Sequence, residues 1–253
     1  MTWIGWNMPR HYNHAPIVEA IIDLRTAWPQ ALSQDTIASF AESVKDQFPI
    51  VNDITRVSMD FRGNEQGVGE FNSQQDKVGL RLASDRGDRV LQLQPTVFTY
   101  SHLPPYSDWV TFRDEARPLW LSYAKMTQGS LVTRLAVRVI NKLRLPVSIA
   151  DLPRYSNLLA CLPRGIPSTP EGFFTQMQLN GSAWASNCQV LLNAGALPQP
   201  DGKVELLLDF DIFVNAPHAS DSPQLWEILD KLSTAKDDLF EGCITEETRE
   251  LIA

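Results

Sequence analysis

The chain has 253 residues and a net charge of −8, with 43% apolar and 21% charged residues. This composition is that of an ordinary globular protein and excludes an intrinsically disordered chain, which would combine lower hydrophobicity with a higher net charge. No window reaches the roughly 18 uninterrupted apolar residues that a membrane-spanning helix needs, so no membrane association is predicted.

Four strands are predicted in the first half of the chain, where β-branched and apolar residues recur between turn residues. They span 17–25, 54–62, 77–83 and 89–100. The turn at 85–88 joins the last two strands as a hairpin, and Pro95 forces an edge, a bulge or a break in the fourth. After the first strand, Ser33 begins and Pro49 ends an apolar pattern that predicts a helix over 33–48.

The second half of the chain is predicted to hold two long helices, four more strands and a short closing helix. A helix over 108–125 begins at an aspartate that can cap it, and another over 222–240 has Pro223 at its first position. The closing helix is expected over 246–252, after Thr245 as its cap. The strands are expected at 131–145, 173–179, 189–192 and 204–214.

Antiparallel hairpins combined with a few long helices favour an α+β fold over a doubly wound α/β fold. We therefore expect a largely antiparallel sheet with strand–helix units and the three main helices packed on it. A single domain, 1–253, is predicted, and the alternative is two lobes, 1–145 and 171–253, joined by a Pro-rich connector over 146–170. Proline removes backbone donors, so this connector is expected to hold at most one helical turn, near 154–162.

Two pairs of charged residues lie on strands that are expected to be central. Arg134 and Arg138 share one face of their strand, and Asp209 and Asp211 share one face of a later strand. If the two strands are neighbours, the arginines and aspartates pair across the sheet. The pairs then have two interpretations. They form either an anion-binding or acid–base site, or an ion-pair network that stabilises the sheet. The second interpretation is favoured because structural networks cluster charges as readily as sites do.

No catalytic, metal or cofactor motif accompanies these charges. The chain lacks a Gly-x-Ser-x-Gly elbow, a phosphate-binding glycine loop and a Cys–His pairing motif, and His11 and His14 have no further ligands at metal-site spacing. We therefore predict no catalytic residue, no metal and no cofactor. The cysteines, Cys161, Cys188 and Cys243, are odd in number and far apart, which favours reduced thiols in the cytoplasm.

Five segments along the chain resemble a sporadically distributed bacterial protein family of unknown function, about 250 residues long. They are the APIVEA segment 15–20, Pro105 and Tyr106 followed by Trp109 and Phe112, the segment 134–141 (RLAVRVIN), the LDFD segment 208–211, and Lys236, Phe240, Ile244 and Thr245 in the tail. Their order and spacing, more than any single motif, carry the resemblance. The patchy occurrence of this family among bacteria implies mobile or defence-linked genes, and the resemblance supplies no catalytic residue or ligand.

The charge divides unevenly along the chain, since 1–150 holds 16 basic and 15 acidic residues, whereas 151–253 holds 6 and 15. A binder of duplex nucleic acid needs a basic face, so duplex binding is not expected. The leading hypothesis is a non-enzymatic interaction protein whose acidic part masks a basic face of a partner protein. With the family resemblance, this indicates the antitoxin-like or sensor component of a bacterial defence or toxin–antitoxin locus.

Two alternatives remain open from the sequence. The first is an enzyme or a small-anion-binding protein that uses the charged sheet face. The second is a single-stranded nucleic-acid binder that uses Arg81, Arg86 and Arg89 with Tyr100. Homo-oligomer formation is left open as well.

Overall fold

The computed structural model describes residues 10, 12–27, 32–63, 69–126, 130–158, 165, 168 and 170–253, with the backbone alone for 60–63 and 69–72. In this part of the chain, ten strands form one sheet, and every strand pair is antiparallel. The prediction of an α+β protein with a largely antiparallel sheet is confirmed. The division into one domain or two lobes stays a prediction.

The strands are β1 (Ile17–Ala27), β2 (Ile50–Gly63), β3 (Gly69–Ala83), β4 (Arg89–Gln94), β5 (Val97–His102), β6 (Leu131–Leu145), β7 (Phe173–Asn180), β8 (Cys188–Pro198), β9 (Val204–Val214) and β10 (His218–Ala219). Their order across the sheet is β2-β3-β4-β5-β1-β6-β9-β8-β7, and β10 pairs with β6. The strands predicted over 131–145 and 204–214 are therefore neighbours at the centre of the sheet, as expected.

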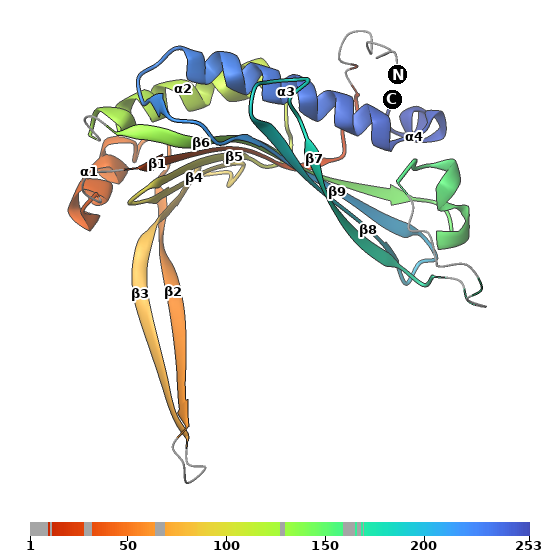
Figure 1. Ribbon diagram of the computed structural model, residues 1–253, viewed down its shortest axis with the longest axis horizontal. Coiled ribbons are helices and arrows are strands. Elements are labelled where there is room, and N and C mark those ends of the chain that lie inside the picture. The colour runs from red at the N-terminus through yellow and green to blue at the C-terminus, as the bar shows by residue number, and fades with distance from the viewer. Residues whose placement is uncertain are drawn as a thin grey trace.

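The helices are α1 (Gln34–Ser43), α2 (Trp109–Lys125), α3 (Gln224–Cys243) and α4 (Glu246–Ile252), with a 3-10 helix at Ile149–Arg154. Helices α2 and α3 extend along one face of the sheet, and α1 lies near one end of it (Figure 1). The core is built from this face, where Ile22, Val137 and Phe210 of the strands and Trp120 and Leu229 of the helices are fully buried. The opposite face of the sheet carries the charged residues.

Several element boundaries differ from the sequence prediction, and three of these differences concern a break, an early end and a shifted turn. The strand expected over 89–100 is two strands, β4 and β5, because a turn at 95–96 interrupts it at the proline. Helix α1 ends before the predicted residue 48, since the amide of Val44 already donates to a carbonyl three residues earlier. The helical turn expected near 154–162 lies at Ile149–Arg154, and much of 159–169 falls outside the described residues.

Strands β2 and β3 continue beyond the sheet as a long two-stranded arm (Figure 1). Strand β4 pairs only with Leu80–Ala83 of β3, so the rest of β3 pairs with β2 alone. At Gly79 a Cβ atom would lie 2.2 Å from the carbonyl oxygen of Leu93, which requires glycine where the arm leaves the sheet. Val57 and Met59 of the arm are 54% and 67% exposed, so these apolar side chains of β2 face solvent.

Candidate functional site

The register between β6 and β9 brings the four predicted charged residues together. Arg138 lies directly opposite Asp211, and Leu135, Val137 and Val139 alternate with the arginines toward the core. Because side chains alternate along a strand, burying one set in the core directs the charged set to the other face. The sequence prediction that these strands neighbour each other and that their charges pair is confirmed.

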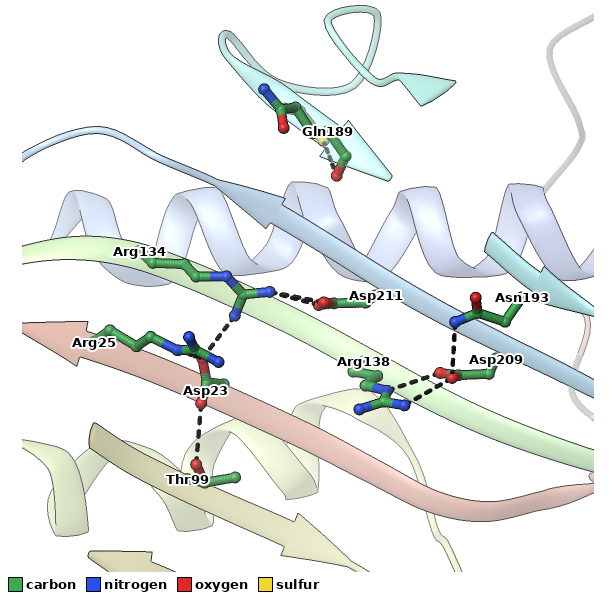
Figure 2. A network of polar contacts seen from close by, with 10 residues as sticks. Asp23, Arg25, Thr99, Arg134, Arg138, Gln189, Asn193, Asp209 and Asp211 are labelled. Atoms are coloured by element: carbon green, nitrogen blue, oxygen red, sulfur yellow. Dashed lines mark hydrogen bonds and ion pairs between the residues drawn. The ribbon is translucent and has the colours of Figure 1, made fainter. Parts of the chain in front are cut away.

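Arg134 links two strands through two carboxylates (Figure 2). Its Nη1 lies 2.6 Å from Oδ1 of Asp23 on β1, and its Nη2 donates to both carboxylate oxygens of Asp211 on β9 at 2.8 Å. The guanidinium also lies over the ring of Phe213, 4.6 Å from the ring centroid. With its side chain only 15% exposed, Arg134 fastens β6 to both of its neighbours.

Arg138 makes the second link, a two-pronged contact with Asp209 (Figure 2). Its Nε and Nη2 donate to the two carboxylate oxygens at 2.8 and 2.7 Å. Asp209 also accepts a hydrogen bond from Asn193 of β8 at 3.1 Å, and Gln176 of β7 donates to Asn193 at 2.7 Å. The side chain of Asp209 is only 8% exposed, so its charge depends on these partners rather than on water.

Asp23, Asn193 and Gln176 belong to this network, and sequence reasoning missed them. Asp23 accepts from Arg25 at 2.9 Å and from Thr99 at 3.0 Å besides Arg134. A signal for Asp23 existed, because this charged residue lies between Ile22 and Leu24, which face the core, and therefore points to the opposite face of β1. Asn193 and Gln176 are neutral residues with no such signal.

The chemistry of this face is that of a closed network. Three arginines, Arg25, Arg134 and Arg138, meet three aspartates, Asp23, Asp209 and Asp211. An anion that entered would compete with carboxylates already bound at 2.6 to 2.9 Å. The geometry therefore favours the interpretation in which these charges stabilise the sheet, and a ligand-binding role for Arg134, Arg138, Asp209 and Asp211 stays a prediction.

A second polar cluster fastens α2 to β4 and β5. Glu115 accepts hydrogen bonds from Arg89 and from the Tyr100 hydroxyl, both at 2.8 Å, and its Oε2 lies 2.7 Å from Nε2 of His102. Burial would raise the pKa of Glu115, but hydrogen bonds from Arg89, Tyr100 and His102 outweigh it and lower that pKa to about 2. Burial also lowers the pKa of His102, although its hydrogen bond with Glu115 opposes this.

This cluster bears on the single-stranded nucleic-acid alternative. Tyr100 is 2% exposed and Arg89 pairs with Glu115, so neither presents a free group to a nucleic acid. Arg86 is exposed and Arg81 is half-buried. The single-stranded nucleic-acid alternative relies on Tyr100 to stack on a base. The structure does not bring that ring to the surface.

Within the described part of the chain, metal, thiol and membrane features add no further site. Among the described residues, no group of three or more His, Cys, Asp or Glu side chains is arranged to hold a metal ion, and His11 lies outside them. Cys188 and Cys243 are buried free thiols whose pKa burial raises to about 11 and about 12, whereas Cys161 lies outside the described residues. No helix in the described ranges has the length and apolar character needed to cross a bilayer.

The surface of α3 and α4 concentrates the negative charge of the second half. From Gln224 to Ile252 there are eight acidic and three basic residues. Glu227, Glu246, Glu247 and Glu250 are exposed. More than half of the excess negative charge of 151–253 therefore lies on these two helices, on the side of the sheet opposite the charged network.

Comparison with protein-family models and with curated proteins gives no match. The resemblance to the sporadically distributed bacterial family thus stays a prediction that rests on its five segments.

Proposed function

We propose that the protein is a non-enzymatic interaction protein that binds a basic partner protein through the acidic surface of α3 and α4. The excess of acidic residues on these two helices is the observation that carries the proposal. Acidic surfaces select and orient basic partners by long-range attraction. The closed ion-pair network on the other face supports the assignment because it leaves the helical side as the strongly charged free surface.

The biological setting of the proposal is the antitoxin-like or sensor component of a bacterial defence or toxin–antitoxin locus in the cytoplasm. This setting assumes that the three main helices pack on the sheet, so that their outer surfaces are available to a partner. Toxins of such loci that act on nucleic acid need a basic surface, which an acidic helical layer would mask. The family resemblance and the spacing of the cysteines support this setting.

Co-expression with the product of each adjacent gene tests the proposal. We expect one product to form a complex that survives gel filtration and weakens as salt rises, because exposed charges are screened. The double variant Glu246→Lys with Glu250→Lys should weaken binding roughly tenfold or more, since each reversal places like charges together. A control that reverses an acidic charge on the edge strand β2, Asp53→Lys, should leave binding unchanged. Complex formation that is insensitive to the helix variants would refute the proposal.

We also expect no tight binding to duplex DNA at physiological salt. The protein has a net charge of −8, and its acidic helices would repel phosphates. A mobility-shift titration with duplexes of varied sequence is the measurement. Sequence-specific binding below about 1 μM, a typical upper bound for specific recognition, would overturn this expectation.

A further inference from the structure

A pocket of about 520 Å³ lies on the helical side of the sheet, away from the charged network. Four segments form its walls, namely the chain around 12–17, the residues 106–110 at the start of α2, the part of β6 near Asn141, and α3. A pocket of this volume can hold a small organic molecule or one large side chain. None of the residues discussed above as the charged network lines it.

Four aromatic rings contribute to the lining of this pocket. They are Tyr12 from the N-terminal segment, Tyr106 and Trp109 beside α2, and Phe240 from α3. Tyr12 and Phe240 contact each other edge to face, with ring centroids 6.1 Å apart. The indole nitrogen of Trp109 is fixed by Asp230 at 2.7 Å, which holds that ring in place. The faces of such rings attract cations through their quadrupoles.

The hydroxyl of Tyr106 is the unusual group of this pocket. Its oxygen is buried and has no hydrogen-bond partner among the described residues. Burial raises the pKa of Tyr106, and the charges of Asp237 and Asp108 raise it further, so the hydroxyl stays protonated at neutral pH. A buried hydroxyl without a hydrogen-bond partner is unfavourable, so a ligand that supplies a partner is favoured. The free lone pairs of its oxygen can accept an N–H from such a ligand.

The charges of the lining are predominantly negative. Asp108, Asp230, Asp237 and Glu241 face Arg10 and Lys236. Lys236, a residue only 8% exposed, bonds to Asp237 through its ammonium, while Asp230 and Glu241 have arginine partners outside the pocket. Asp108 caps the N-terminus of α2 and accepts from Thr111, so all four carboxylates have partners within the protein, and the lining itself counts four acidic against two basic side chains.

We propose that this pocket binds an organic cation, an ammonium or guanidinium group carried on an apolar or aromatic body. The four rings attract the cation, the oxygen of Tyr106 accepts one N–H, and the carboxylates of the lining, which outnumber its two basic side chains, favour a positive charge. The cation has two sources, a free amine or a lysine or arginine side chain of a protein. The inference goes beyond the acidic helix surface, because a free amine would meet the same groups without any protein partner.

Isothermal titration with 2-phenylethylamine and its neutral counterpart 2-phenylethanol tests the proposal. The two probes differ in one group, so a difference in affinity reports the charge. We expect the amine to bind in the millimolar range or tighter and roughly tenfold more tightly than the alcohol. Equal binding of both probes, or no binding of the amine up to several millimolar, would overturn the proposal.

Two conservative variants locate the binding in this pocket. Tyr106→Phe removes only the hydroxyl, Asp237→Asn removes a negative charge and leaves Lys236 without its carboxylate, and each should weaken amine binding by roughly fivefold. The matched controls are Tyr155→Phe and Asp238→Asn, whose side chains do not line the pocket, and they should change nothing. Affinity that is unaffected by Tyr106→Phe and Asp237→Asn, in proteins with wild-type melting temperatures, would contradict the proposal.

A third probe, N-acetyl-lysine methylamide, distinguishes the two sources of the cation. Binding comparable to that of 2-phenylethylamine supports a basic side chain of a protein, and binding of the amine alone supports a small-molecule ligand. If the partner protein of the acidic surface is found and Tyr106→Phe leaves its binding intact while amine binding falls, the pocket is a separate ligand site. The acidic-helix variants should lower partner binding without changing the amine titration. The two proposals can therefore fail independently.

Discussion

Replacing Arg138 with alanine is expected to lower the free energy of unfolding by about 3 kcal/mol. The loss comes from Asp209, whose 8% exposed carboxylate gives up its two contacts at 2.8 and 2.7 Å and keeps only the weaker partner Asn193. Arg134→Ala should cost a similar amount, since Asp211 and Asp23 are 21% and 13% exposed and both lose a guanidinium. Urea denaturation followed by circular dichroism measures the change.

An exposed ion pair provides the matched control. Arg144 lies on the same strand as Arg138. Its side chain is 64% exposed and contacts Asp201 at 2.7 Å. Arg144→Ala should change the unfolding free energy by less than about 0.5 kcal/mol, because water replaces the lost contact. If Arg138→Ala and Arg144→Ala had equal, small effects, the network would not stabilise the sheet.

Replacing Glu115 with alanine is expected to cost about 3 kcal/mol through the groups it leaves without an acceptor. Tyr100 and His102 are buried and both lose their acceptor, whereas Glu115 is 39% exposed and Arg89 is partly open to solvent. Asp114→Ala is the neighbouring control, since Asp114 is 56% exposed and should contribute little. A melting temperature equal to that of the control variant would contradict this role for Glu115.

The same cluster predicts a stability that falls in acid. The pKa of Glu115 is lowered from 4.5 to about 2, so its contribution is present above pH 4.5 and is lost as the pH falls toward 2. The pKa of His102 is also lowered from 6.5, so below pH 6.5 protons favour the unfolded chain. Melting temperatures between pH 7.5 and 3 should fall, and the fall should be smaller in Glu115→Ala. An equally steep fall in that variant would show that other groups cause it.

The sequence predicts the central sheet well because each strand there has to satisfy two conditions at once. Leu131–Leu145 and Val204–Val214 alternate between apolar residues that the helices bury and charges that face away, and both strands were predicted with the bounds that the structure has. Strand β8 was predicted too short, since Gly195 and Pro198 are poor strand formers that pairing with β9 overrides.

The partners within the charged network were only partly predictable. Alternation along two strands identifies Arg134, Arg138, Asp209 and Asp211 as one face, but the strand that lies on the other side of β6 depends on tertiary pairing. Asp23 joins Arg134 because β1 is that neighbour. The pocket could not be predicted from the sequence for the same reason. Its walls come from segments far apart in the chain, and its key feature is an unpaired hydroxyl.

A double-mutant cycle between Arg138 and Asp209 tests most directly whether the charged face stabilises the sheet rather than binding a ligand. The unfolding free energies of Arg138→Ala, Asp209→Asn and the double variant give the coupling between the two side chains. A structural pair at this burial should show a coupling of about 2 kcal/mol, with the double variant less destabilised than the sum of the single variants. A coupling below about 0.5 kcal/mol, with both single variants as stable as the wild type, would contradict the account.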